Sequence, residues 1–314
     1  MRAIRAVAGT TAVCAYALIV LGAVVRSTNS GLSCPDWPSC YGHMLPLPGD
    51  IPAEAGYAYW QVMLEWVHRL IAGVAVGPLV LVLVGLTWMR RQERPILFRA
   101  GLVLLALLLI QGILGGVTVL DRNSPWSVAL HLGNALLVLS TILFVFVRSG
   151  PIPVATDRGG IVLMAALAWV LALAAMITAA ITAKTGSSLA CTTWPLCDGA
   201  LVPDLSDGGI RIHFAHRVLA GATALAVIGL FLASRHETGG VRSLATAAVA
   251  LVVAQVGLGA SVILLEAPVA IAVTHQAVGV LTFAMVTLLL WHCLPLTAPS
   301  SLGGGSHGLA LRGT

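Results

Sequence analysis

Four histidines recur in a regular pattern along this chain of 314 residues. The segment His68-Arg69-Leu-Ile-Ala-Gly matches His216-Arg217-Val-Leu-Ala-Gly, and one further histidine follows in each copy, at His131 and His275. A single histidine is often no more than a hydrogen-bonding residue. Two per copy, in a repeated order, favour a ligand role, because neutral imidazole is a common ligand of metals and of heme iron.

The histidine pairs predict one heme per copy. Paired histidines on facing helices of a four-helix bundle hold a cofactor in the bundle core, and two imidazoles bind heme iron from its opposite faces. Zinc or copper more commonly recruits a third ligand, such as cysteine or a carboxylate. We therefore expect His68 and His131 to hold one heme iron, and His216 and His275 another.

Residues near the histidines fit a bound heme, although each has a simpler explanation. A flat, bulky plate needs small neighbours, which the chain supplies at Gly112, Gly115, Gly116, Gly257, Gly259, Ala260 and Ser261. Ordinary helix packing uses the same residue types, so both explanations stay open. Arg69 and Arg217 are expected to pair with heme propionates; the alternative is that their side chains extend to the membrane interface.

Glu65 distinguishes the two copies. The first copy reads Glu65-Trp-Val-His68, whereas the second reads His213-Phe-Ala-His216 and has no carboxylate. Residues three apart share a helical face, so Glu65 is expected beside His68. A carboxylate there could move protons or stabilise a cation, or could simply be a polar residue at headgroup depth. The asymmetry indicates that the first copy does chemistry and the second transfers electrons.

Each copy also carries a pair of cysteines separated by five residues, Cys34 with Cys40 and Cys191 with Cys197. An oxidising exterior favours disulfides, and each bridge would brace a short loop over the heme face. We interpret Cys191–Cys197 as structural. A redox role stays open for Cys34–Cys40, because that pair belongs to the copy with Glu65.

Composition places these residues in a membrane. Hydrophobic residues make up 58% of the chain and charged residues 9%, against roughly 25% charged residues in soluble domains. Only a bilayer can accommodate that much apolar surface. The net charge of +5 reflects arginines in short loops, and no basic run with interleaved aromatics is present, so nucleic acid is excluded as a partner.

Apolar stretches of about 20 residues predict transmembrane helices. Eight are expected, at about 8–26, 64–88, 97–120, 127–147, 161–182, 213–234, 243–265 and 270–293. Two long polar loops, 27–63 and 183–212, contain the cysteines. The fold class is therefore an all-α integral membrane protein with two tandem, pseudo-symmetric four-helix bundles. We expect halves at 1–155 and 156–295, and a flexible tail at 296–314.

Arginine placement predicts the orientation. Most arginines fall on one side of the predicted spans: Arg2, Arg5, Arg90, Arg91, Arg94, Arg99, Arg148, Arg158, Arg235 and Arg242. The other side has few basic residues, namely Arg26, Arg122, Lys184 and Arg211. We expect a multi-pass protein of the cell membrane with both termini cytoplasmic and both cysteine loops extracellular.

Taken together, Glu65-Trp-Val-His68-Arg69, His131-Leu, His216-Arg217, His275-Gln and the two cysteine pairs resemble heme A synthase. The resemblance covers about residues 5–295 and is to the bacterial form with a cysteine pair in each half. It implies that heme O binds between His68 and His131 as substrate, and that heme b lies between His216 and His275. It also implies that the C8 methyl group of heme O is oxidised to a formyl group, giving heme A, with help from Glu65 and with water as the oxygen source.

The resemblance also implies partners: the farnesyltransferase that makes heme O, a terminal oxidase that receives heme A, and an electron acceptor for which a quinone is one candidate. Rival functions remain. A diheme b-type electron carrier explains the histidines but not Glu65, and a disulfide-forming quinone reductase explains the cysteines but not the histidines. A transporter would place its polar groups near mid-membrane, whereas here they gather near one face. The better alternative of this class is a heme-handling protein that leaves the porphyrin unchanged.

Overall fold

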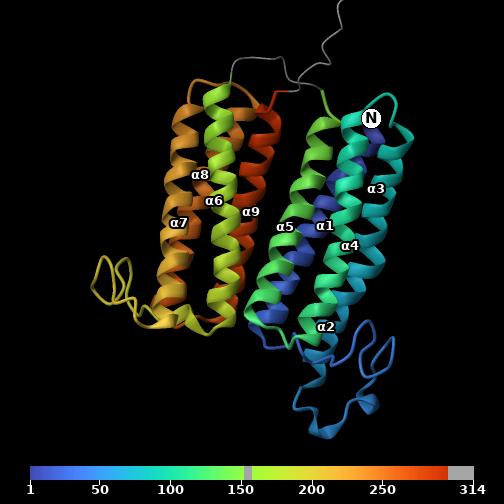
Figure 1. Cartoon of the computed structure of the whole chain (residues 1–314), viewed down its shortest axis with the longest axis vertical. Helices are drawn as coiled ribbons and strands as arrows, with labels where there is room; N and C mark the ends of the chain where they lie inside the picture. The colour runs from blue at the N-terminus through green and yellow to red at the C-terminus, as the bar shows by residue number, and fades with distance from the viewer. Residues whose placement is uncertain (152–157, 296–314) are drawn as a thin grey trace, which may run out of the picture.

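The computed structural model describes residues 1–151 and 158–295, and within them the chain is helical (Figure 1). Eight helices or helix pairs are long and apolar enough to cross a membrane, which confirms the predicted fold class. The α-helices are α1 (Arg2–Ser27), α2 (Tyr59–Ile71), α3 (Gly77–Met89), α4 (Pro95–Leu120), α5 (Pro125–Arg148), α6 (Gly159–Lys184), α7 (Gly208–Ala233), α8 (Gly240–Leu264) and α9 (Val269–Cys293). Short 3-10 turns lie in the two long loops, at Pro48–Asp50, Ala53–Ala55 and Ser187–Leu189.

Local sequence explains where these helices begin. Pro95 and Pro125 open α4 and α5, where a missing N–H costs nothing and the fixed φ suits a helix. Ser124 and Asp207 cap α5 and α7 by accepting hydrogen bonds from backbone N–H groups of the first turn. Most helices extend a few residues beyond the apolar stretches, because polar residues at headgroup depth continue the helix without entering the lipid core.

The second predicted span, at about 64–88, is not one uninterrupted α-helix. Between α2 and α3 the chain makes one π turn, Ala72–Val76, closed by a hydrogen bond from Gly77 N–H to the Ala72 carbonyl. Pro78 follows, and it has no N–H with which to complete a regular α-helical ladder. The corresponding residue of α7 is Ala226, and α7 runs without a break. The helix that carries Glu65 and His68 therefore changes geometry just after them, whereas its counterpart does not.

The two halves lie side by side (Figure 1). Helices α1–α5 form one group and α6–α9 the other, and both long loops emerge at the same end of the molecule. Helix α1 begins and α9 ends at the opposite end, as a parallel repeat with four spans per half requires. The predicted boundary near residue 155 and the predicted tail 296–314 lie outside the described residues.

The halves meet through α1 and α5 of the first and α6 and α9 of the second. The buried apolar core of the first half continues into this seam, where Met176 and Phe283 join it. Hydrogen bonds also cross the seam: Trp291 donates to the carbonyl of Ser140 at 3.0 Å, and Arg148 donates to that of Leu294 at 2.6 Å. The two halves therefore form one packed body.

Candidate heme sites and the loops that cover them

The four predicted ligand histidines fall on four different helices near the end with the long loops. His68 is on α2, His131 on α5, His216 on α7 and His275 on α9, each in about the second or third turn. His131 is close enough to His68 to interact with it electrostatically, and so is His216 to His275. The structure therefore brings the histidines together in the predicted pairs.

In the first half the imidazole rings lie against glycines. A Cβ atom at Gly22 of α1 would come within 3.2 Å of the His68 ring, and one at Gly115 within 3.4 Å of the His131 ring. Gln111 places its amide nitrogen 3.3 Å from both ring nitrogens of His131. Gln111 is itself held by Asn134, which donates to its Oε1 at 2.6 Å. His131 thus has a polar neighbour fixed by a second amide.

The second half contains a cavity of about 380 Å³ with His216 and His275 in its wall, within the range of roughly 300–1,000 Å³ typical of cofactor sites. The Nδ1 of His216 lies 3.1 Å from the carbonyl of Ala175. Such a hydrogen bond fixes the tautomer and leaves Nε2 for a metal. A Cβ at Gly259 would come within 3.2 Å of the His275 ring. A side chain at position 259 would therefore have to displace the His275 ring by a few tenths of an ångström.

These surroundings fit a heme iron better than a bare metal ion. Within residues 1–151 and 158–295, no group of three or more His, Cys, Asp or Glu side chains could hold a metal, so the structure offers pairs of histidines. Nδ1 of His68 and Nδ1 of His275 are buried without a hydrogen-bond partner in the described chain. Buried polar atoms are normally paired, and a bound prosthetic group would change the surroundings of both rings.

The small residues predicted to flank heme have different roles. Gly115 and Gly259 lie against histidine rings, as just described, and Gly116 lies against the indole of Trp37 from the first long loop. Gly112 and Gly257 face open space, with no atom within 4 Å of an added Cβ. Close approach to an imidazole or indole therefore explains some of these glycines, and the others are not required by any contact in the described chain.

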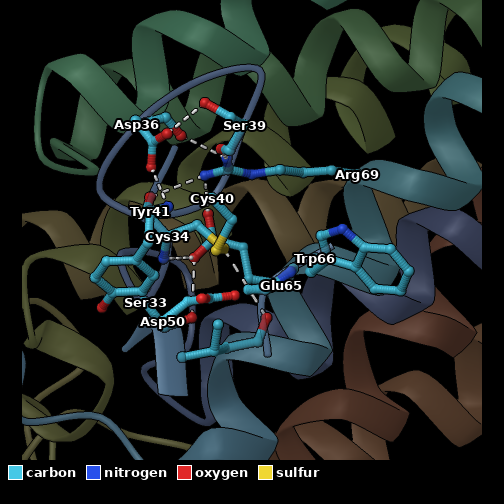
Figure 2. Close-up of a disulfide and its surroundings, with 12 residues drawn as sticks. Ser33, Cys34, Asp36, Ser39, Cys40, Tyr41, Asp50, Glu65, Trp66 and Arg69 are labelled. Carbon is cyan, nitrogen blue, oxygen red and sulfur yellow. Dashed lines mark hydrogen bonds and ion pairs between the residues drawn. A yellow bond between two sulfur atoms is a disulfide. The ribbon is translucent and has the colours of Figure 1, made fainter. Parts of the chain in front are cut away.

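Glu65 is buried beneath the first disulfide loop (Figure 2), with 4% of its surface exposed. One carboxylate oxygen accepts hydrogen bonds from the N–H of Cys34 at 3.1 Å and from the hydroxyl of Ser33 at 3.2 Å. The other accepts from Arg69 at 2.6 Å, one helical turn away. Cys34 and Arg69 thus hold the carboxylate in one position. The single hydroxyl proton of Ser33 is shared between Glu65 and the nearer carbonyls of Ser30 and Gln61.

Arg69 ties the same loop to α2. Besides Glu65, its guanidinium donates to the carbonyls of Asp36 at 2.6 Å, Ser39 at 2.8 Å and Cys34 at 3.0 Å (Figure 2). These contacts occupy both terminal nitrogens. The predicted propionate role of Arg69 stays a prediction, and the structure gives Arg69 a second task, which is to cap the carbonyls of the cysteine loop.

Both cysteine pairs are joined as disulfides. The sulfur atoms of Cys34 and Cys40 lie 1.98 Å apart and those of Cys191 and Cys197 lie 2.04 Å apart. In each loop an aspartate accepts hydrogen bonds from its neighbours. Burial alone would raise the pKa of Asp36, but hydrogen bonds from Ser39 and two backbone N–H groups outweigh it and hold the pKa below its ordinary value.

His213 occupies the place of Glu65 in the second half. The N–H of Cys191 lies 3.2 Å from its Nδ1, and Nε of Arg217 lies 3.2 Å from its Nε2. Arg217 also donates to the carbonyls of Cys191 and Leu196, as Arg69 does in the first loop. A neutral imidazole has only one acceptor nitrogen, so His213 can accept from only one of these donors at a time.

Sequence reasoning gave His213 no role, because a histidine three residues before His216 looked like a departure from the repeat. The useful signal was its position: it aligns with Glu65 when His68 is placed on His216. Arg26 was also missed as a site residue. It lies at the end of α1, in the first half, yet it lines the cavity of the second half.

Comparisons with known proteins agree with this architecture. Residues 5–287 match the COX15-CtaA model, described as cytochrome oxidase assembly protein. A heme A synthase from Shewanella oneidensis is 29% identical over 312 positions, which cover 88% of this chain and 93% of that protein. Heme A synthases from Rhodospirillum centenum (31% identical, covering 95% of this chain and 90% of that protein) and Symbiobacterium thermophilum (32%, 83% and 85%) are similar along most of their length. The chain therefore belongs to the COX15-CtaA family of cytochrome oxidase assembly proteins.

Proposed function

We propose that this protein is a heme A synthase, which oxidises the C8 methyl group of heme O to a formyl group and so produces heme A. The observation that carries the proposal is the combination of two histidine pairs with one carboxylate, Glu65, which is the one buried carboxylate among the described residues and lies on the helix of His68. The family and the names of the relatives support it.

The first half, up to about residue 155, would bind heme O as substrate between His68 and His131. Glu65 lies on the same helix as His68 and is fixed by Cys34 and Arg69. A fixed negative charge at that place can stabilise positive charge that develops on the porphyrin edge as the methyl group loses electrons, or can accept a proton from it. With water as the oxygen source, the oxidation releases both protons and electrons, so an acceptor for each is required.

The second half, residues 156–295, would hold heme b between His216 and His275. Heme b, when bound, supplies electron transfer between the substrate site and an external acceptor. The residues of the chain orient it: Ala175 fixes His216, and Gly259 makes room for the His275 ring. The acceptor is proposed to be a quinone or a partner protein.

The setting of the reaction follows from the helices. We propose a multi-pass protein of the cell membrane with cytoplasmic termini, because most arginines lie at the end opposite the cysteine loops. The extracellular side would then contain both disulfides, where oxidising conditions preserve them. A farnesyltransferase that makes heme O is the expected source of substrate, and a terminal oxidase under assembly is the expected destination of heme A.

The proposal is tested by the hemes that the protein contains and makes. The full chain is expressed with a source of heme O, purified in detergent, and its hemes are extracted for chromatography and mass analysis. Heme A or its hydroxylated intermediate, together with heme b, supports the proposal, and both oxidised products should disappear in Glu65→Ala. Heme b alone, with heme O unchanged, would refute it and favour a diheme electron carrier or a heme-handling protein.

A further inference from the structure

Arg26 belongs to the first half of the chain but reaches the site of the second. It lies in the last turn of α1, and its Nη2 donates to Oε1 of Gln276 on α9 at 3.1 Å. Gln276 directly follows His275, and both line the same cavity as Arg26. This hydrogen bond crosses the seam between the halves at the end where the histidines lie.

The charge around that cavity is one-sided. Arg26 and Arg217 line it, and no aspartate or glutamate does. Within the described residues Arg26 takes part in no ion pair, and its one side-chain hydrogen bond is to the neutral amide of Gln276. Arg217 donates hydrogen bonds to His213 and to backbone carbonyls and has the carboxylate of Asp198 nearby, so Arg26 is the cation of this wall without a counter-ion among the described residues. A partly buried cation without a counter-ion is costly, so the cavity is built for an anion.

The first half has no equivalent of the hydrogen-bonded pair Arg26 and Gln276. When the two copies are aligned on their serine-containing loops and their histidines, Ala183 corresponds to Arg26 and Leu132 to Gln276. Neither can donate to or bind a carboxylate. The pair is therefore a feature of the second site and not of the repeated bundle as such.

We propose that Arg26 binds a propionate carboxylate of the heme held by His216 and His275, so that the first half completes the heme site of the second. This proposal rests on the proposed function, in which the cavity holds heme b. A guanidinium pairs with a carboxylate through two parallel hydrogen bonds, which a lysine cannot reproduce. Gln276 holds the guanidinium at the cavity while leaving most of its N–H groups free to bind the anion.

The test measures how fast the second site releases heme. Purified full-length protein carrying His68→Ala and His131→Ala, which removes the first ligand pair, is mixed with excess apomyoglobin, and heme transfer is followed by absorbance. Loss of a charge-assisted hydrogen bond in Arg26→Gln should speed release about 10- to 100-fold. Arg26→Lys should fall between, and Arg211→Gln, which removes an exposed arginine of the same loop end, should leave the rate unchanged.

Esterified heme separates a propionate contact from general loosening of the site. The same variants are loaded with hemin dimethyl ester, whose propionates carry no charge. Arg26→Gln should then release its heme at the wild-type rate, and Gln276→Leu, which introduces the residue of the first half, should have a smaller effect on hemin than Arg26→Gln has.

Two results would overturn the proposal for Arg26: wild-type release of hemin from Arg26→Gln, or equal acceleration for hemin and its diester. A different failure would show that the cavity is not the heme b site at all. In that case His216→Ala, added to the background variant, would leave heme b content unchanged. The heme assignment would then fall independently of the role of Arg26.

Discussion

The two cysteine loops are built alike but rest on different side chains. In each loop the N–H of the first cysteine donates to the residue three positions before His68 or His216. The arginine that directly follows that histidine donates to the loop carbonyls. Glu65 accepts from Cys34 and Arg69 together, whereas His213 can accept only once. The scaffold is therefore shared, and among the described residues only the first half places a buried carboxylate at this position.

At the position of Glu65 and His213, the structural role of holding the loop is therefore separate from the chemical role of the side chain. A residue at this place is needed in both halves to hold the disulfide loop to its helix, and either a carboxylate or an imidazole can do so. Only the carboxylate adds an anion beside the histidine pair. Exchanging the two side chains should therefore separate the structural role from the chemical one.

The largest expected effect comes from Glu65→His, which gives the first half the residue of the second. The loop can still be held through the imidazole, so the protein should keep its heme b and its thermal stability. Formation of heme A should fall at least about 100-fold, the usual loss when an acid–base or charged catalytic group is removed. Product analysis by chromatography measures the loss.

The reciprocal variant His213→Glu is the control for that exchange. It should form an ion pair with Arg217 and hold the loop as Glu65 does, and heme A formed per retained heme b should be unchanged; heme b content is measured alongside because His213 lines that cavity. Normal heme A formation by Glu65→His would contradict the chemical role of Glu65 and leave it as a loop anchor alone.

The next effect concerns the π turn, which α2 and α3 have between them and the described helices of the second half do not. Ala226→Pro places a proline in the middle of α7, where it should cost about 3 kcal/mol because no widened turn accommodates it. Pro78→Ala should be tolerated or slightly stabilising, since the π turn already absorbs the missing N–H. Thermal unfolding in detergent, followed by circular dichroism, measures both. Equal destabilisation by the two changes would argue that the π turn is unrelated to Pro78.

Removing the disulfides should sharpen the contrast between the loops. Each encloses a short loop, and loss of either should cost about 2 kcal/mol on chain-entropy grounds. The double variant of Cys34 and Cys40 to serine should also lower heme A formation, because the Cys34 N–H helps to fix Glu65. The same change at Cys191 and Cys197 should affect stability and heme b retention, and should lower heme A formation only in proportion to the heme b that is lost. A loss of product that is equal in both variants would show that loop stability, and not Glu65 placement, is responsible.

The smallest expected effect is at Asn134, whose counterpart in the second half is Val278. Asn134→Val removes the hydrogen bond that fixes Gln111 against His131, which is worth about 1 kcal/mol. Heme O affinity should change about five-fold, as measured by titration of the purified protein and difference absorbance. Among the described residues Oε1 of Gln255 has no hydrogen-bond partner, and no hydrogen bond joins its side chain to His275, so Val278→Asn should leave heme b binding as it is. Unchanged heme O affinity in Asn134→Val would show that the position of Gln111 does not contribute to heme O binding.

Much of the fold could be predicted because lipid imposes it. A stretch such as 97–120 has no alternative to a spanning helix, and the repeated His-Arg pair is sufficient to align the two halves. The π turn at Ala72–Val76 was not predicted, because a single proline in an apolar stretch indicates a kink or break without specifying which kind.

Sequence indicates which residues share one helical face, but it does not indicate contacts that depend on packing between helices. Glu65 and His68 share a helical face, which spacing alone indicates. Arg26 acts across the seam on a residue 250 positions away, and nothing in its local sequence shows that α1 lies against α9. His213 was missed for another reason, since its chemistry differs from that of Glu65 although its geometry is the same.

The seam has a consequence for biosynthesis of the protein. Among the described helices α9 comes last in the chain, and it carries His275 and packs against α1 and α5. The pair of His216 and His275 is therefore incomplete until α9 has been made and inserted. If this pair holds heme b as proposed, heme b would be loaded only onto a chain in which α9 is already in place.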